Sequence, residues 1–372
     1  MNRTALFGKH TLLKANIIDF FGWKMPLHYE AGTLKEHMAV RTSAGIFDVS
    51  HMGDFLINDT PDSKLQSLLT NNITDVGVGK SIYTHLPDED GRIIDDLIVT
   101  KLENNVFFCV PNASMVDTVQ NWMIEKAGVE IINLTHDLTC IALQGPEIFK
   151  HMEALFGTEY ESIQKFSIKS YDFHDGHFRE ISDISETELK GNLGIISRTG
   201  YTGEEGFEII LPNSFAEEYW DHLINRGILP IGLGARDTLR LEMGYLLSGQ
   251  DFNRDRTTME TNCSWVIKWD HDFMGKEIME HQKIAKTHQK MIGININGKA
   301  PARTGSTVYL KDSPNEIVGS VSSGNYSPTL GHSIALAYLD REYYKPDLEV
   351  GLEYHGRHLT GTTTKTPFIK KK

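Results

Sequence analysis

The chain has 372 residues, of which 40% are hydrophobic and 23% charged, and its formal net charge is −13 at pH 7. This composition is typical of a globular protein with two or three domains, and the acidic balance argues against nucleic-acid binding. No run of about 18 apolar residues could cross a membrane. The N-terminus lacks the pattern of a secretory signal, so we expect a cytoplasmic location. Three scattered cysteines predict neither a disulfide framework nor a zinc site.

The first part of the chain mixes helix and strand patterns. A helix is predicted over 31–45, with Leu34, Met38 and Val40 on its buried face and Gly45 at its end. The following patterns predict a strand over 47–57, a helix over 63–73, strands over 81–87, 92–102 and 105–112, and an amphipathic helix over 114–128. Turn-forming residues join the three consecutive strands, as in hairpins. This order indicates an α+β fold rather than a doubly wound sheet.

The second part of the chain changes in composition and in hydrophobic pattern toward its end. A strand, a Gly-Pro turn and a helix are expected over 138–157, and strands flank a charged insertion at 182–190. Helices are predicted over 213–227 and 235–249. From about Lys290 onward, short strand patterns alternate with turns rich in Gly, Pro, Ser and Asn. This alternation of short strands and turns predicts a separate all-β module, either a barrel or a sandwich.

Two adjacent carboxylates, Asp95 and Asp96, stand in the middle of the apolar strand pattern RIIDDLIV. Side chains alternate between the faces of a strand, so the two point in opposite directions. One interpretation is structural: both carboxylates accept hydrogen bonds from the backbone or an arginine. The other is functional: one of them faces a pocket and exchanges protons near neutral pH. Burying a charged carboxylate without a hydrogen-bond partner or a counter-charge costs free energy. Both interpretations therefore require that the buried carboxylate is paired, neutralised or part of a functional site.

Two further stretches carry candidate site residues. In 197–208, SRTGYTGEEGFE, closely spaced glycines indicate a backbone held close to another group, but the spacing is not that of a phosphate-binding loop. A plain hairpin or bulge is the alternative. In GLGARDTLRLEMGY, Arg236 and Arg240 are one helical turn apart, which suits either a surface ion-pair ladder or an arginine that binds a carboxylate or a polar heterocycle. No HExxH or GxSxG motif occurs, and a metal site is not expected.

The order and spacing of several motifs resemble the T-protein family of the glycine cleavage system, which are folate-dependent aminomethyltransferases. The motifs are FGWKMPLHY, VRTSAGIFDVSHMG, GRIIDDLIV, ALQGP, SRTGYTGEEGFE, GLGARDTLRLEMGYLLSGQD and SGNYSPTLGHSIALA. The resemblance covers nearly the whole chain and implies a cloverleaf of three domains around a central folate cavity. On this basis we expect a first α+β domain at 1–52 with 138–230, a second at 53–137, a connecting helical segment at 231–287 and a C-terminal β domain at 288–372.

The resemblance also implies a reaction and a set of site residues. The family transfers the methylene of an aminomethyl-dihydrolipoyl H-protein to tetrahydrofolate, which yields 5,10-methylenetetrahydrofolate, ammonia and the dihydrolipoyl H-protein. Its functional aspartate falls on Asp96, which implies that Asp95 is structural. Its folate-binding positions fall on Glu208, Arg236, Tyr201, Tyr245, Tyr83 and Asn112. Tetrahydrofolate and H-protein are thus the expected partners, without a metal or a flavin.

Two other functions within the wider family stay open at this point. One is a folate-binding factor of iron–sulfur cluster assembly, which usually has a short motif around a reactive cysteine; the cysteines here do not form one. The other is a demethylating domain of the kind that is joined to a flavoprotein, although no flavin module is present in this sequence. Complementation of glycine cleavage, compared with cluster-enzyme activity, would separate the first from the transferase. The second predicts methylglycine-linked turnover with a flavin partner, and its absence in a coupled assay would exclude that function.

Overall fold

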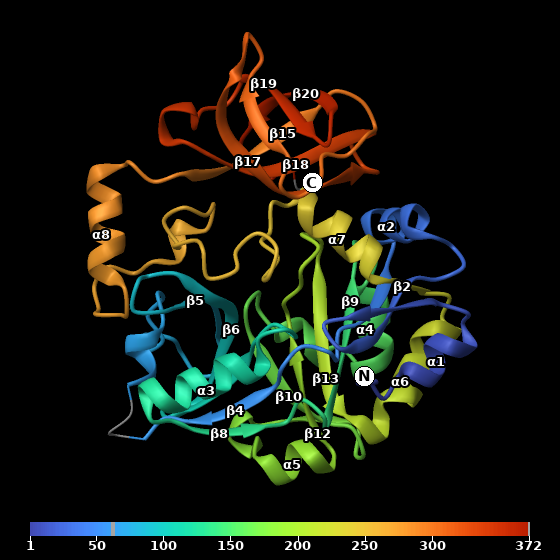
Figure 1. Cartoon of the computed structure of the whole chain (residues 1–372). Helices are drawn as coiled ribbons and strands as arrows, with labels where there is room; N and C mark the ends of the chain where they lie inside the picture. The colour runs from blue at the N-terminus through green and yellow to red at the C-terminus, as the bar shows by residue number, and fades with distance from the viewer. Residues whose placement is uncertain (61–63, 371–372) are drawn as a thin grey trace. The chain divides into compact units, whose positions relative to one another are not determined.

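The computed structural model describes residues 1–60 and 64–370, which form two compact units (Figure 1). The first unit contains Met1–Thr84 and Asp96–Arg236, and the second contains His85–Asp95 and Asp237–Lys372. Across the described residues, no helix is long and apolar enough to span a membrane.

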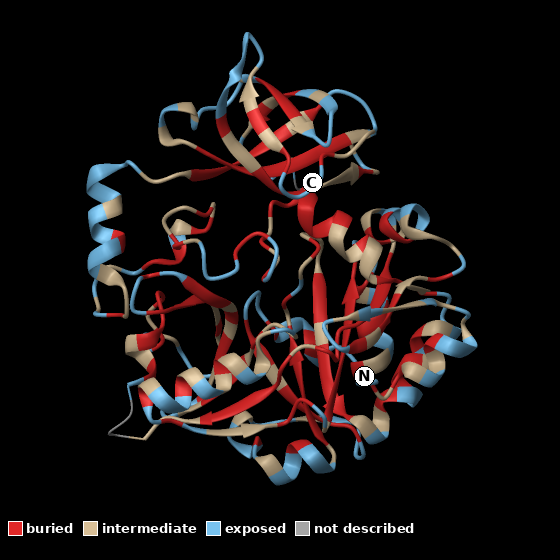
Figure 2. Ribbon diagram, in the orientation of Figure 1, coloured by how far each residue is buried: buried red, intermediate tan, exposed pale blue. Residues whose placement is uncertain are grey.

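A seven-stranded sheet is the centre of the first unit, in the order β11-β10-β12-β13-β9-β3-β14. Its strands are β3 (Gly45–Asp48), β9 (Leu138–Gln144), β10 (Ile168–Asp172), β11 (His177–Arg179), β12 (Leu193–Ser197), β13 (Gly206–Pro212) and β14 (Leu229–Pro230). All neighbours are antiparallel except β14, which runs parallel to β3. Every residue of β9 is buried, as expected for a strand in the middle of a sheet (Figure 2).

Alternation along the central strands decides which side chains enter the core. Phe207, Ile209 and Leu211 of β13 pack with Ile141 and Leu143 of β9 in one hydrophobic cluster. Helices α1 (Phe7–Leu12), α4 (Phe149–Phe156) and α6 (Asn213–Asn225) contribute to or border this cluster. Glu208, between two core residues, therefore points to the opposite face of the sheet.

A five-stranded sheet has the order β5-β6-β7-β4-β8. Its strands are β4 (Phe55–Asn58), β5 (Ser81–Pro87), β6 (Ile93–Glu103), β7 (Val106–Val110) and β8 (Glu130–Asn133). Helix α3 (Val116–Ala127) ends at Gly128, which has φ +70° and so closes the helix in the left-handed conformation that favours glycine. A separate two-stranded ribbon consists of β1 (Asn16–Phe20) and β2 (Trp23–His28).

The second unit contains a closed barrel in the order β15-β18-β17-β16-β19-β20. Its strands are β15 (Lys290–Ile296), β16 (Thr307–Leu310), β17 (Ser313–Ser327), β18 (His332–Leu339), β19 (Glu349–Tyr354) and β20 (Arg357–Thr364). Alternate aliphatic side chains, such as Ile292, Ile294 and Ile296, fill its interior. Helix α8 (Lys276–Ala285) precedes the barrel in the chain. The α+β class and the C-terminal barrel are confirmed, whereas the four domain boundaries and the cloverleaf stay predictions.

The predicted buried face of the first long helix is confirmed for Val40, which is fully buried, but it is wrong for Leu34 and Met38. Helix α2 (Thr33–Thr42) ends before Gly45, and Leu34 is 55% exposed and Met38 37% exposed, while Glu36 is fully buried. The Glu36 carboxylate accepts hydrogen bonds from the backbone amides of Tyr29 (2.6 Å) and Gly232 (2.9 Å). These contacts satisfy backbone donors far apart in the chain, so they decide the orientation of the helix against its hydrophobic pattern.

The single strand predicted over 47–57 is also wrong, because the chain leaves one sheet after Asp48 and enters the other at Phe55. The Asp48 carboxylate accepts hydrogen bonds from the Ser50 amide (2.9 Å) and hydroxyl (2.6 Å), which turns the backbone there. We call residues 49–54 the β3–β4 loop. This turn separates two strands that the apolar pattern had joined.

The helix predicted over 63–73 is reduced to a 3₁₀ turn, η1 (Leu65–Leu68), and residue 63 lies outside the described residues. The Gln66 side chain accepts a hydrogen bond from the Ile73 amide (2.6 Å) and donates one to the Asn71 carbonyl (3.1 Å). Side-chain hydrogen bonds thus satisfy backbone groups that a continuous helix would have paired. The charged insertion contains a short helix, α5 (Glu186–Gly191), and further 3₁₀ turns lie at η2 (Glu159–Ser162), η3 (Ile181–Asp183), η4 (Ser264–Val266) and η5 (Arg341–Tyr343).

Candidate active site

The two adjacent aspartates on β6 have different surroundings. Asp95 is fully buried, belongs to the second unit and accepts a hydrogen bond from the Ser248 hydroxyl (2.7 Å). Asp96 is half-buried and belongs to the first unit. The strand alternation therefore separates a carboxylate held in the interior from one that keeps access to solvent or a ligand.

Two side chains orient the Asp96 carboxylate. The Tyr83 hydroxyl on β5 donates to Oδ2 (2.7 Å), and the Asn112 amide, two residues after β7, donates to Oδ1 (2.7 Å). The same amide donates to the Asp96 carbonyl (3.1 Å). Both oxygens of the Asp96 carboxylate are therefore held in a defined orientation, one by a side chain of β5 and the other by a side chain that follows β7. Three of the seven expected site residues are brought together in this way.

The glycine-rich segment packs on one buried side chain, Gln144 at the end of β9. The Gln144 amide donates to the Thr199 carbonyl (3.1 Å), and its oxygen accepts from the Thr202 hydroxyl (2.9 Å). A Cβ atom on Gly200 or Gly206 would overlap the Gln144 side chain. Neither glycine has a positive φ, so they are required here for close approach rather than for an unusual backbone conformation.

Glu208 is the first half-buried side chain on β13 after this segment. Its Oε2 atom accepts a short hydrogen bond from the Thr199 hydroxyl, which also contacts the Ser197 hydroxyl (2.8 Å). Its Oε1 atom has no hydrogen-bond partner among residues 1–60 and 64–370. One oxygen is therefore fixed and the other remains able to accept from a ligand.

Arg236 and Tyr201 form the other part of this site. Arg236 lies in the first turns of α7 (Leu233–Glu242), and its Cζ atom is 4.7 Å from the centre of the Tyr201 ring. Within the described chain, no side chain or carbonyl accepts a hydrogen bond from its guanidinium. Burial lowers the pKa of Arg236, while Tyr201 and the Glu208 carboxylate oppose this effect. An arginine stacked on a ring and free at its N–H edge suits a planar or anionic ligand.

Tyr245 and Arg240 belong to the second unit. The Tyr245 carbonyl accepts a hydrogen bond from Arg240 Nη1 (2.9 Å), and Tyr245 is half-buried. Arg240 is 1% exposed and pairs with the fully buried Asp251 (2.7 Å), so the interpretation as a surface ion-pair ladder is wrong for this residue. Its neighbours on the barrel and in the loop after α7 make it a structural residue of the second unit.

Two buried ionisable side chains of the β3–β4 loop were missed by sequence reasoning. Burial and the charge of Arg236 lower the pKa of His51 to about 4, and burial and the charge of Glu208 raise the pKa of Asp54 to about 8. Both effects come from residues remote in the chain. The only signal in the sequence was the placement of charged residues between two apolar runs, which a plain loop also has. Within the described part of the chain, no cluster of three or more His, Cys, Asp or Glu side chains could hold a metal ion.

The chain matches known families over almost its full length. The GCVT N-terminal domain matches residues 6–271, and the glycine cleavage T-protein C-terminal barrel domain matches residues 289–370. The aminomethyltransferase of Thermotoga petrophila is 40% identical, with 100% of this chain and 98% of that protein covered. That of Chlorobium phaeovibrioides is 38% identical, with coverages of 100% and 99%. A crystal structure of glycine cleavage system aminomethyltransferase T from Bartonella henselae has a TM-score of 0.87 and 27% identity, with 99% and 98% covered.

An α+β part that matches the GCVT N-terminal domain, a C-terminal barrel, and aminomethyltransferase relatives matched over almost their full length together place the chain in the aminomethyltransferase class of enzymes. The chain belongs to the glycine cleavage T-protein family, as its motifs had indicated. Its activity is therefore aminomethyl transfer in glycine cleavage.

Proposed function

We propose that the chain uses tetrahydrofolate and a lipoylated H-protein as its two substrates and that it does so in the cytoplasm. Asp96 accepts and donates protons during the transfer. In the overall reaction the carbon–sulfur and carbon–amine bonds of the aminomethyl group break, and bonds from its carbon to N5 and N10 of the folate form. The two N–H protons of the folate end on ammonia and on the dihydrolipoyl thiol. The reaction needs no oxidant or reductant.

The observation that carries this proposal is the Asp96 carboxylate held by Tyr83 (2.7 Å) and Asn112 (2.7 Å) in a half-buried position. N5 loses a proton as it attacks, and the leaving amine gains one. A carboxylate held in one orientation near both atoms can accept the first proton and supply the second. Fixing its orientation in advance reduces the entropy cost of the step.

The residues around β13 supply the proposed folate-binding part. Oε1 of Glu208 accepts from the N–H groups of the pterin, while Thr199 keeps the carboxylate in place. Arg236, stacked on Tyr201, binds a pterin acceptor or the ring face. Tyr245 belongs to the second unit, and its proposed role in folate binding rests on the family's motifs alone. The residue assignments are supported by their contacts and by the family's motifs.

The first test is calorimetric titration with tetrahydrofolate, followed by ammonia release when aminomethylated H-protein is added. Asp96→Asn is expected to lose transfer by about 100-fold or more, while tetrahydrofolate affinity changes less than about threefold because the shape is kept. Asp95→Asn is the matched control on the same strand and should retain transfer. Near-normal turnover of Asp96→Asn would show that the Asp96 carboxylate does not transfer protons in the reaction.

Glu208→Gln tests the binding part separately. Replacing a charged acceptor by an amide should weaken tetrahydrofolate binding by about tenfold or more. An unchanged affinity would contradict the assignment of Glu208. Binding of tetrahydrofolate without ammonia release from the aminomethylated H-protein would contradict the proposed pair of substrates.

A further inference from the structure

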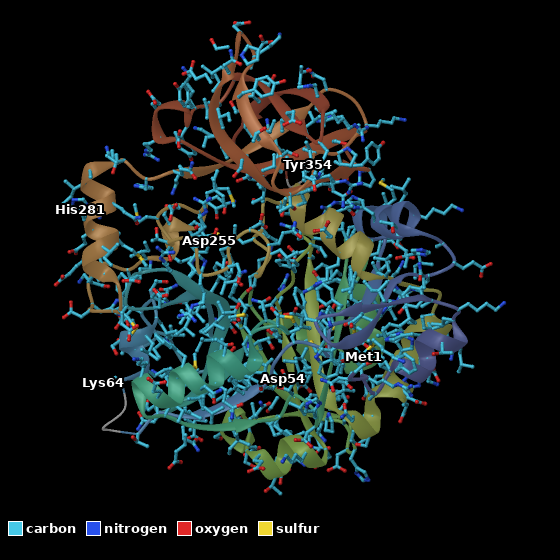
Figure 3. The ribbon with its side chains drawn as sticks, viewed as in Figure 1. Met1, Asp54, Lys64, Asp255, His281 and Tyr354 are labelled. Atoms are coloured by element: carbon cyan, nitrogen blue, oxygen red, sulfur yellow. The ribbon has the colours of Figure 1, made fainter. Side chains whose placement is uncertain are left out.

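The β3–β4 loop contains a buried aspartate, Asp54, whose carboxyl has no hydrogen-bond partner in the described part of the chain. Asp54 is 2% exposed, and no described residue donates a hydrogen bond to its carboxyl oxygens. Its backbone is held on both sides: the amide donates to the Thr135 hydroxyl (3.2 Å), and the carbonyl accepts from the Leu134 amide (2.8 Å). These two hydrogen bonds hold the backbone at Asp54, a residue that is labelled in Figure 3.

A second aspartate next to this loop, Asp48, provides a comparison, because its buried carboxylate is fully hydrogen-bonded. Asp48 accepts hydrogen bonds from the hydroxyl of Thr4 (2.6 Å), the ring of His10 (2.8 Å) and the amide and hydroxyl of Ser50. These bonds lower the pKa of Asp48 to about 2 despite its burial. A buried carboxyl without such bonds costs several kcal/mol if it is charged, so Asp54 requires another explanation.

The charges around Asp54 come from several elements. Burial and the Glu208 carboxylate on β13 raise the pKa of Asp54 to about 8. Cys140 on β9 has a pKa well above 9.0, raised by burial and by the carboxylates of Glu208, Asp54 and Asp48. His51 is neutral at pH 7, since burial and Arg236 lower its pKa to about 4, and its Nδ1 atom has no partner among the described residues. Asp54 is therefore expected to change charge near pH 8.

A protonated carboxyl beside a charged one offers a donor next to an acceptor. The heterocycle of a pterin alternates acceptor nitrogens and a carbonyl with N–H donors, so its edge needs both kinds of partner. We propose that Asp54 is a further ligand-binding residue of the folate site, where it donates a hydrogen bond to an acceptor atom of the pterin while Glu208 accepts from an N–H group. Carboxylic acids kept neutral in apolar sites act as hydrogen-bond donors in the same manner. This inference rests on the proposed function.

The test measures tetrahydrofolate affinity under anaerobic conditions from pH 6.5 to 9.5. In the unmodified protein, affinity should be constant up to about pH 8 and then fall by about tenfold per pH unit, because the donor is lost. Asp54→Asn should bind within about threefold of the unmodified protein at pH 7 and show no such fall, because an amide still donates. Asp172→Asn, at another buried aspartate of the first unit, is the matched control and should keep the original pH profile.

A measurement on the unmodified protein does not depend on how the variants fold. Calorimetry at pH 9 in buffers with different ionisation enthalpies should show uptake of close to one proton per tetrahydrofolate bound. Binding without pH dependence or proton uptake, or the same fall in Asp54→Asn, would overturn the role of Asp54 and leave the proposed function standing. Absence of tetrahydrofolate binding at every pH would instead overturn the proposed function, and this inference with it.

Discussion

The buried ion pair between Arg240 and Asp251 predicts a large stability loss on Arg240→Met. Arg240 is 1% exposed and Asp251 fully buried, and Nη1 lies 2.7 Å from Oδ2. The guanidinium also donates to Asp237 (2.9 Å) and to the Ser323 hydroxyl (2.8 Å) of the barrel strand β17. The substitution leaves the Asp251 carboxylate buried without its cation. Removing one partner of such a pair costs about 3–5 kcal/mol.

Urea unfolding followed by circular dichroism and tryptophan fluorescence would measure this change. The double variant Arg240→Met/Asp251→Leu should regain part of the loss, since no buried charge then remains unpaired. Lys311→Met breaks the exposed pair with Glu349 (2.9 Å) in the same unit and serves as control, with little change expected. A loss in unfolding free energy below about 1 kcal/mol for Arg240→Met would contradict this expectation. It would mean that the Ser322 and Ser323 hydroxyls and the Leu247 amide suffice to stabilise the Asp251 carboxylate.

Three further predictions concern the first unit. Gly206→Ala should lower stability by about 1–3 kcal/mol because the new methyl displaces Gln144, whereas Gly191→Ala, with open space around it, should not; equal melting temperatures would contradict this. Arg236→Lys should weaken tetrahydrofolate binding at least about tenfold, because lysine lacks the planar fork that stacks on Tyr201; a calorimetric affinity within twofold would contradict it. The carboxyl of Asp54 loses its proton at about pH 8 in the folded protein and near pH 3.8 in the unfolded chain. The contribution of Asp54 to the unfolding free energy is therefore complete only below about pH 4, and it falls as the pH rises to about 8. The difference in unfolding free energy between Asp54→Asn and the unmodified protein should therefore increase, in favour of the variant, by about 1.4 kcal/mol per pH unit over that range. Urea denaturation at a series of pH values measures it, and a difference that stays constant with pH would contradict the prediction.

Much of the candidate site could be predicted from local patterns. The period of two along a strand separates Asp95 from Asp96 and Glu208 from Phe207, and both separations are found in the structure. An all-β module, either a barrel or a sandwich, also followed from turn residues at short intervals between β-forming runs, and the structure has the barrel. Such signals arise between residues close in the chain, so they can be recognised without a tertiary structure.

The contacts of the site residues could not be predicted in this way. That Tyr83 and Asn112 bond the two oxygens of Asp96 depends on three strands meeting in one sheet. Leu34 and Met38 of α2 were wrongly expected to be buried, because the buried Glu36 accepts hydrogen bonds from the amides of Tyr29 and Gly232. Gly232 is almost 200 residues away in the chain. Hydrophobic periodicity contains no information about such hydrogen bonds.

Strand alternation, turn chemistry and the spacing of motifs are properties of neighbouring residues, so the α+β class, an all-β C-terminal module and the family could be recognised without coordinates. Long-range contacts are needed to see that Thr4, His10 and Ser50 satisfy Asp48, whereas no described residue donates a hydrogen bond to the carboxyl of Asp54, six residues later. Two carboxyls of the same type thereby acquire a pKa of about 2 and of about 8. This difference arises because burial, and the donors and charges around a side chain, are set by segments distant in sequence.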